Sequence, residues 1–373
     1  MIIRTEVLQD SCAKILGAVD SNALSAITET LEMSAVNKML TLSITNRDYF
    51  VEVKLPIDTD ETLYATVNAN LFLRLISKVT SETIELSVED RSLNVKCNGL
   101  YKFALIYDGD SLMHLPRIEV EDVTETVKMD SSFLRSLVSY NSKELLKGTI
   151  SKPIQKLYYV DSDGAITFTT GACVNTFDTG LTSKILLSDK LVKLMKLFKD
   201  GDVDVTIGRN CLGNDILVTS VAFTAPNIMI SAVLSSDESM TVGFPVTAIR
   251  NRALAEYPYT VSFNKDVFTQ AVDRLMLFNQ IGVAGSAMST LKMEFNNCGV
   301  VISDKTDTNK EEIPFTKPNE SISNYVAYID SGDLTKTLAS CTNQLVTCAF
   351  GNTQAFVLTE GKVKWVIPEV QEY

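Results

Sequence analysis

The chain has 373 residues, of which 45% are hydrophobic and 21% are charged, so it can bury a large core and is not a disordered polypeptide. Its formal charge of −12 argues against binding nucleic acid through the whole surface, although the 34 basic residues can still gather on one face. No apolar run approaches the roughly 18 residues of a membrane span, and the first residues lack a signal-peptide pattern, so we expect a cytoplasmic protein without membrane contact.

Cysteine and histidine usage disfavours several kinds of chemical site. The seven cysteines are scattered and include no C-x-x-C pair, so the sequence predicts free thiols rather than disulfides or a zinc cluster. His114 is the only histidine, which disfavours multi-histidine metal sites and leaves one imidazole for any Ser-His or Cys-His nucleophile. We therefore expect neither a metal nor a cofactor.

The first third of the chain predicts two helices followed by a meander. Apolar residues at helical spacing predict an amphipathic helix over about 5–19, and alternating residues predict two strands within 40–56. Asn68 is the expected N-cap of a second helix. Three alternating strands follow, separated by turn residues at 89–91 and 98–99.

The same order of elements returns twice. In the second third, helices over about 131–141 and 188–198 flank strands within 156–178, and three more strands follow. In the last third, helices over about 265–278 and 330–339 are placed in the same way, again with three strands at the end. The first apolar residues of the three leading helices lie 126 and 134 residues apart, which is the length of a whole domain.

This recurrence defines the predicted fold class. Each copy supplies two helices that can cover one face of a sheet. We predict an α+β chain of three similar domains, each with two helices packed on antiparallel sheet. The predicted domains are residues 1–124, 125–254 and 255–373.

Basic residues recur on one side of the predicted helices. In the helix that begins at Ser188, lysines recur every three residues opposite apolar residues such as Leu191 and Met195. On one helix such a stripe can simply be a solvated face, but its presence on six helices favours a shared positive surface. The candidate residues of that surface are Lys14, Arg74, Lys78, Arg135, Lys190, Lys193, Lys196, Lys199, Arg274 and Lys336.

Several segments carry a resemblance to a known family. They are Lys-Leu-Val-Lys-Leu-Met-Lys-Leu-Phe-Lys-Asp-Gly-Asp at 190–202, Val-Thr-Ile-Gly at 205–208, Ile-Met-Ile-Ser-Ala-Val-Leu at 228–234, Gly-Phe-Pro at 243–245 and Trp-Val-Ile-Pro at 365–368. In their order and spacing, over essentially its full length, the chain resembles the bacterial sliding clamp, the beta subunit of DNA polymerase III. The resemblance implies the DNA clamp fold in a head-to-tail homodimeric ring of six domains, with sheets outside and helices lining a hole for duplex DNA.

Helix geometry agrees with the implied ring. Twelve helices spaced by roughly 8–10 Å place their axes on a circle about 35 Å across, which leaves a hole of about 25 Å. Such a ring holds DNA by topology, so weak, sequence-independent attraction between basic side chains and phosphates is enough. The family's basic loop after the first helix corresponds to uncharged residues 21–24 here. The loop after the third helix keeps Lys143, Lys147 and Lys152.

The family's partner-binding groove lies between its second and third domains and accepts a short peptide from polymerases and the clamp loader. Its strand motif, Thr-Asp-Gly-His-Arg-Leu, corresponds to residues 169–174, where Ala172 and Cys173 replace the histidine and arginine. The resemblance implies a groove formed by Thr169, Gly171, Ala172, Cys173, Val174, Pro245, Ile249, Val366 and Ile367. We expect an apolar anchor peptide that differs from the bacterial consensus, as in a phage-encoded or otherwise divergent clamp, although plain core packing also explains these residues.

The family's dimer contact joins an edge strand of the first domain to a helix end of the third. The matching residues here are Phe103, Leu105, Tyr107, Leu277 and Phe278. An apolar edge strand over 101–107 would invite aggregation if left open, so pairing with a second copy is reasonable, but an internal strand fits the residues equally well.

Two other classes of function compete with a clamp. An enzyme would have to use His114 or the aspartate pairs at 108/110 and 161/163, which lie at predicted turns where aspartate is favoured for conformational reasons. A phage structural protein of repeated beta domains would share the threefold pattern but would not need basic residues on every helix. We therefore predict a non-catalytic processivity factor whose partners are double-stranded DNA, a DNA polymerase, a clamp loader and a second copy of itself.

Overall fold

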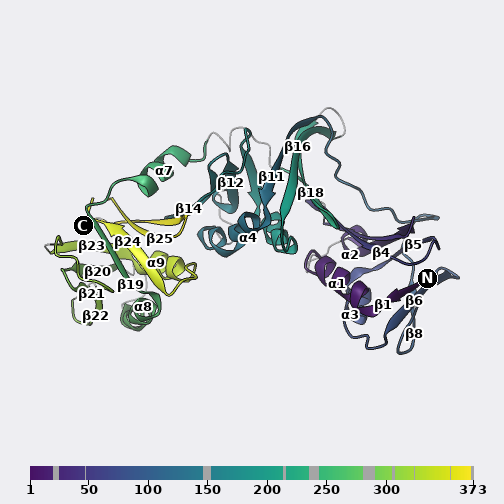
Figure 1. Cartoon of the computed structure of the whole chain (residues 1–373), viewed down its shortest axis with the longest axis horizontal. Coiled ribbons are helices and arrows are strands. Elements are labelled where there is room, and N and C mark those ends of the chain that lie inside the picture. The colour runs from purple at the N-terminus through teal and green to yellow at the C-terminus, as the bar shows by residue number, and fades with distance from the viewer. Residues whose placement is uncertain are drawn as a thin grey trace. The chain divides into compact units, whose positions relative to one another are not determined.

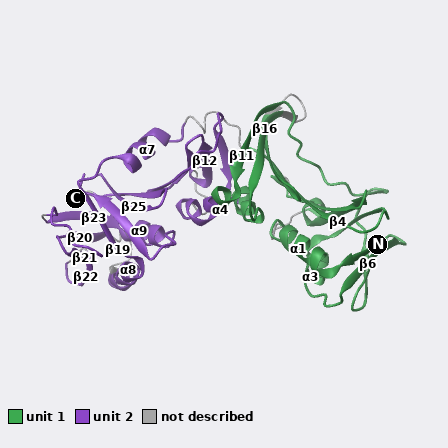
Figure 2. Ribbon diagram, viewed as in Figure 1, with its two compact units in different colours: residues 1–135, 190–236 green, residues 136–189, 237–373 purple. Residues whose placement is uncertain are grey.

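The computed structural model describes residues 1–19, 25–46, 48–145, 153–212, 216–234, 243–279, 290–304, 307–322, 324–352 and 354–370. The chain divides into two compact units, which are coloured separately in Figure 2. Unit 1 contains residues 1–135 and 190–236, and unit 2 contains residues 136–189 and 237–373.

The elements follow one another in an order that recurs along the chain (Figure 1). The first set is β1 (Ile2–Arg4), α1 (Thr5–Leu16), α2 (Ala26–Glu29), β2 (Thr30–Val36), β3 (Met39–Thr45), β4 (Tyr49–Pro56), β5 (Leu63–Asn68), α3 (Ala69–Ile76), β6 (Thr83–Glu89), β7 (Ser92–Lys96) and β8 (Leu100–Ala104). A short hairpin follows, formed by β9 (Tyr107–Asp108) and β10 (Ser111–Leu112).

The second and third sets repeat that order. The second is β11 (Val123–Asp130), α4 (Ser131–Ser139), the 3-10 helices η1 (Asn141–Glu144) and η2 (Pro153–Lys156), β12 (Leu157–Asp161), β13 (Gly164–Phe168), β14 (Ala172–Thr176), β15 (Ile185–Ser188), α5 (Asp189–Leu194), the 3-10 helix η3 (Met195–Leu197), β16 (Asp202–Leu212), β17 (Ile216–Ala225) and β18 (Ile228–Val233). After α7 (Val246–Leu254), the third is β19 (Tyr259–Asn264), α8 (Lys265–Asn279), β20 (Thr290–Phe295), β21 (Gly299–Ser303), β22 (Lys310–Pro314), β23 (Tyr325–Asp330), α9 (Ser331–Leu338), β24 (Leu345–Phe350), β25 (Ala355–Glu360) and β26 (Val363–Pro368).

Strand pairing repeats as well as element order. In each set the leading strand pairs with the final meander, which gives the orders β1-β6-β7-β8, β11-β16-β17-β18 and β19-β24-β25-β26. The other strands pair as β5-β2-β3-β4, β15-β12-β13-β14 and β23-β20-β21-β22. The predicted α+β class with a threefold recurrence is therefore confirmed, whereas the domain boundaries after residues 124 and 254 stay a prediction.

Two strand pairs join successive sets into eight-stranded antiparallel sheets. In unit 1, β18 pairs with β4, and in unit 2, β14 pairs with β26. In both pairs, the last strand of one meander meets the last strand of a four-strand group. Within the described residues, β8 pairs only with β7 and β22 pairs only with β21, so the corresponding edges of the first and third sets are open.

The helices form where capping and apolar spacing coincide. The side chain of Asn68 accepts a hydrogen bond from the Leu71 amide at 3.0 Å at the start of α3, as the sequence predicted. Asp330 accepts one from the Asp333 amide at 2.9 Å at the start of α9. Helices α1 and α3 pack side by side in unit 1, as do α8 and α9 in unit 2 (Figure 1). Each unit therefore presents a pair of neighbouring helices.

Candidate functional site

A pocket of about 290 Å³ lies in unit 2, where β14 pairs with β26. One wall is the end of β13, the following turn and the start of β14, and the opposite wall is α7. Its lining residues are Phe168, Thr170, Gly171, Ala172, Pro245, Ala248, Ile249, Arg252, Val366 and Pro368. Most of these side chains are apolar, and Arg252 is the one charged residue among them. The pocket therefore suits an apolar side chain better than a polar metabolite.

The floor of the pocket is a packed apolar cluster. Ala172, Ile249 and Val366 belong to one buried cluster with Phe244. The ring of Phe244 packs against Tyr159 and Phe168, with centroid distances of 5.0 Å and 4.8 Å. Because these contacts already exist without a ligand, the pocket is preformed.

An ion pair fixes α7, the wall that the sequence did not predict. Arg250 donates two hydrogen bonds to the Asp161 carboxylate at 2.8 Å and 2.5 Å, and its guanidinium lies 3.2 Å from Asp163. Burial alone raises the pKa of Asp161, but the hydrogen bonds and charge of Arg250 outweigh it and hold that pKa below its usual range. The aspartate pair considered as an enzyme candidate therefore anchors a helix beside the pocket.

Replacing Arg250 with methionine is expected to destabilise unit 2 by roughly 2–4 kcal/mol, because it leaves the Asp161 carboxylate buried without its cation. Thermal unfolding near neutral pH measures the loss, and Arg252→Met is the matched control, since Arg252 lies two residues further along α7 and is exposed. Because its folded pKa is lowered, Asp161 contributes stability above its unfolded pKa of about 3.9 and loses it as pH falls through the folded value. A gap between the Arg250 variant and wild type that persists unchanged well below about pH 3 would contradict this assignment.

The pocket includes some of the residues expected in the groove. Gly171, Ala172, Pro245, Ile249 and Val366 line it, and Val174 packs in the cluster beneath. Three others do not line it. Cys173 and Ile367 belong to a second core cluster, because successive residues of a strand point to opposite faces. The hydroxyl of Thr169 donates to Glu144 at 3.2 Å, away from the pocket.

Sequence reasoning missed five of the lining residues. They are Phe168, Thr170, Ala248, Arg252 and Pro368. Strand alternation back from Ala172 would have found the first two, and helical spacing around Ile249 would have found the next two. The spacing that identifies Ala248 and Arg252 is present in the sequence, but it is informative only when residues 246–254 are known to be helical.

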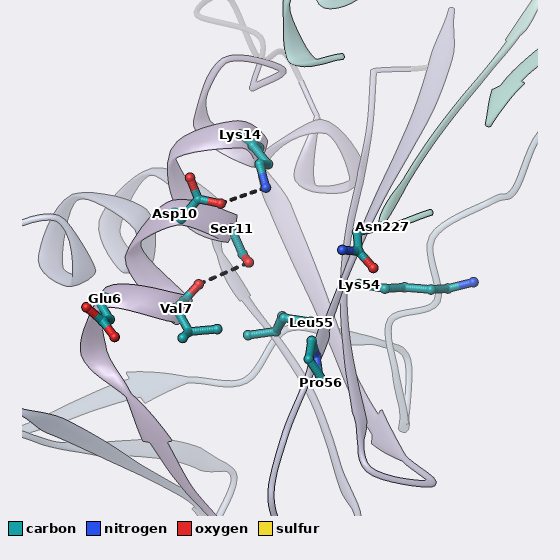
Figure 3. Close-up of a pocket in the computed structure, with 9 residues that line it drawn as sticks. All are labelled: Glu6, Val7, Asp10, Ser11, Lys14, Lys54, Leu55, Pro56 and Asn227. Atoms are coloured by element: carbon teal, nitrogen blue, oxygen red, sulfur yellow. Dashed lines mark hydrogen bonds and ion pairs between the residues drawn. The ribbon is translucent and has the colours of Figure 1, made fainter. Parts of the chain in front are cut away.

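Two of the predicted DNA-facing lysines pair with the same carboxylate in unit 1. Asp10 of α1 forms ion pairs with Lys14 at 2.6 Å and Lys199 at 3.3 Å, and Figure 3 shows the first of these beside a pocket that also contains Lys54 and Asn227. The hydrogen bond from Lys14 holds the pKa of the Asp10 carboxyl below its usual range, against the opposing effect of partial burial. Ion pairs that are largely open to solvent, such as the one between Asp10 and Lys199, contribute little stability.

The other predicted DNA-facing residues fall into groups. Most are exposed, namely Arg74, Lys78, Lys143, Lys190, Lys193 and Lys196. Arg135 donates to the carbonyl oxygens of Phe198, at 2.7 Å, and Lys199, so it caps the end of the neighbouring helix. Arg274 is paired with Glu311 at 2.5 Å and 2.7 Å, and Lys336 is half-buried among carboxylates. Lys147 and Lys152 lie outside the described residues.

The predicted dimer residues differ in exposure. Leu277 and Phe278 at the end of α8 are 60% and 52% exposed. Leu105 is buried, Tyr107 is half-buried, and Phe103 packs on Phe72 with ring centroids 5.6 Å apart. On β8, the exposed apolar side chains are instead Leu100 and Tyr101, whereas Phe103 is partly covered by the ring of Phe72.

The remaining enzyme candidates lack a catalytic arrangement. Nδ1 of His114 lies 2.7 Å from the hydroxyl oxygen of Tyr64, and Asp108 is in the β9–β10 hairpin. Among the residues with a described position, no group of three His, Cys, Asp or Glu side chains is placed to hold a metal ion. Over the same residues, no helix combines the length and apolarity needed to cross a membrane.

The recurring order of sheets and helices is that of the DNA sliding-clamp fold. No protein-family model and no curated protein matches the chain. The DNA polymerase III subunit beta of Pseudomonas aeruginosa is similar over 100% of both chains, with a TM-score of 0.79 and 14% identity. Two further structures match 100% of this chain and 99% of theirs: the beta subunit of Streptococcus pyogenes DNA polymerase, at 0.80 and 15%, and the DNA polymerase sliding clamp of Bacillus subtilis, at 0.75 and 17%.

Proposed function

We propose that this chain is a divergent DNA sliding clamp, of a kind that a phage can encode. Two copies close head to tail around duplex DNA, and the ring tethers a DNA polymerase without catalysing a reaction itself. Partners dock through the apolar pocket at β14 and β26, and a clamp loader opens the ring. The single observation that carries the proposal is the repeated strand topology, which leaves two matching open edges on a chain with the clamp fold.

Those edges support closure by a second copy. The junctions β18–β4 and β14–β26 pair the last strand of a meander with the last strand of a four-strand group. The strands still available for the same pairing are β8 and β22, which belong to opposite ends of the chain. A head-to-tail dimer would pair them twice, once at each contact between the two copies, and would close both of these edges.

Charge and apolar side chains on the edges fit this pairing. If β8 and β22 pair in the same register as β18–β4 and β14–β26, Lys102 lies opposite Glu311 or Glu312. Side chains directly opposite on paired strands lie on the same face, so the charges attract. Leu100 and Tyr101 would be covered from the other copy, and Leu277 and Phe278 at the end of α8 supply further apolar area. Phe103, Leu105 and Tyr107 then support the edge from beneath.

The basic residues provide the second part of the function. An overall charge of −12 keeps the ring from adsorbing to DNA through its outer surface. Lys14, Lys199 and the exposed lysines of α5 and η3 supply positive charge on helices, where a phosphate contact carries no sequence information. The resulting attraction is weak and salt-dependent, which allows sliding.

A cross-linking experiment tests the ring directly and needs no loader. Cysteines replacing Lys102 and Glu312 are joined by a short bis-maleimide in the presence of circular duplex DNA. We expect covalent dimers that stay on the circle in detergent and high salt and are released when the circle is linearised. Single-cysteine variants are the control, because Cys298 is also exposed. Covalent dimers that are never retained on circular DNA would rule out encirclement.

A further inference from the structure

The turn between β13 and β14 forms one wall of the pocket, and buried charges hold it in place. Thr170 and Gly171 line the pocket, while Thr169 points to the other side. A Cβ atom on Gly171 would lie 3.0 Å from the Val366 carbonyl oxygen and 3.6 Å from Oε2 of Glu144. The turn is therefore pressed between β26 and the Glu144 side chain, and any movement of Glu144 reaches the pocket wall.

Lys336 is the centre of the network behind this turn. Its ammonium lies 2.8 Å from the Asp333 carboxylate, 3.4 Å from that of Glu144, and 3.0 Å from the Thr169 hydroxyl. The hydroxyl of Thr170 in turn donates to Asp333. One cation thus joins both threonines of the turn to α9 and to η1.

The burial of Glu144 makes the cation necessary. Its side chain is only 2% exposed, and Lys336 is the cation that contacts it within the part of the chain that the structure describes. The described groups that face it are Lys336, Asp333 and Thr337 from α9, Thr169 from the turn, and Cys173 from β14. A buried carboxylate that loses such a cation is costly, so the local structure would rearrange or the carboxylate would take up a proton.

From this geometry we propose that Lys336 is a positioning residue of the partner-binding pocket rather than a contact for DNA. It holds the 169–171 turn against α9 and η1 and so sets the wall that a docked peptide touches. The inference rests on the proposed function of the pocket. It reassigns a lysine that the sequence placed with the DNA-facing residues, because the ammonium is already committed to two carboxylates and a hydroxyl.

The test compares Lys336→Met with Lys143→Met. Lys143 is exposed on η1, next to Glu144 in sequence, and its ammonium forms no ion pair with a described residue. The probes are an apolar peptide selected from a display library against the wild-type chain, and a short fluorescent duplex at low salt. We expect Lys336→Met to weaken peptide binding about tenfold and leave duplex binding within about twofold, and Lys143→Met to leave peptide binding unchanged. The opposite pattern, with Lys336→Met weakening duplex binding alone, would overturn the proposal.

Two further measurements separate positioning through Glu144 from a direct contact between Lys336 and the peptide. Adding Glu144→Gln to Lys336→Met removes both charges and should restore most of the peptide affinity, whereas affinity lost with a direct contact of the ammonium would not return. In Lys336→Met alone, burial favours the protonated form of Glu144, so affinity should partly return as pH falls from about 7.5 to about 5.5. If neither recovery occurs, the positioning role is wrong.

Failure of the proposed function gives a different result. If the wild-type chain selects no peptide, the pocket is not a docking site. Amide hydrogen exchange of residues 169–171 still reports on the turn, whose Thr169 amide donates to the Gly171 carbonyl at 2.8 Å. We expect Lys336→Met to speed that exchange and Lys143→Met to leave it unchanged. Equal exchange in both variants would show that Lys336 does not hold the turn.

Discussion

Reversing the charge of Lys102 to glutamate is expected to convert the ring into monomers at micromolar concentration. The change would place an acidic side chain opposite Glu311 or Glu312 on the paired strand. Like charges facing each other across a strand pair cost roughly 1–2 kcal/mol at a partly exposed junction. Because the proposed ring contains two such junctions, the dissociation constant should rise by about 30-fold to about 1,000-fold. Sedimentation or light scattering over a concentration series measures the shift.

The compensating variant makes the result specific. Lys102→Glu combined with Glu312→Lys exchanges the charges across both junctions and should restore much of the dimer. Lys96→Glu is the matched control, because Lys96 lies on the neighbouring strand β7, is exposed, and pairs with Glu85 within its own sheet at 3.1 Å. If Lys102→Glu and Lys96→Glu dissociate the protein equally, general loss of positive charge is responsible and the β8–β22 pairing is wrong. A dimer unaffected by Lys102→Glu would also refute it.

Local patterns in the sequence were enough to predict the recurring elements. Asn68 and Asp330 mark helix starts because their side chains satisfy free amides, which is a short-range effect. Alternation along 345–350 likewise reports that this strand is half-buried. At 14–17% identity to solved clamps, the fold is shared although few individual residues are.

Long-range contacts decided what the sequence could not show. Arg250 and Asp161 are 89 positions apart, and nothing local in either segment indicates that they form the ion pair that seats α7. The spacing of Val246, Ile249 and Ala253 is helical. The sequence nevertheless predicted only groove residues in this segment, and no helix. Lys336 shows the same limit. Its position on a helix predicted a solvated or DNA-facing side chain. In the structure, its ammonium instead forms ion pairs with the carboxylates of Glu144 and Asp333.

Strand alternation divides the residues predicted for the groove between two faces of the sheet. The family motif assigns consecutive residues of a strand to one groove, but Ala172 and Cys173 face opposite sides of the sheet. Only the face shared with α7 can touch a docked peptide. The strand period therefore predicts which residues belong together, and the packing of a distant helix decides which set is the binding surface.

Placing a carboxylate in the pocket is expected to abolish partner binding without unfolding the chain. Ala248 is exposed on the first turns of α7 and lines the pocket, so Ala248→Glu puts a charge where an apolar anchor would sit. Displacing that charge or leaving it buried costs roughly 2–3 kcal/mol, which corresponds to a 30- to 100-fold weaker complex. Titration with the display-selected peptide, and with a polymerase once it is identified, measures the loss.

The neighbouring residue supplies the control that makes this experiment decisive. Thr247→Glu adds the same charge to the same exposed turn of α7, but Thr247 does not line the pocket. Both glutamates lie near the N-terminal end of the helix, where a negative charge is favourable, so both variants should keep the wild-type melting temperature. Peptide affinity should fall in Ala248→Glu and stay within about twofold in Thr247→Glu. Equal affinities in the two variants would place the docking surface elsewhere, even if the ring and its hold on circular DNA were intact.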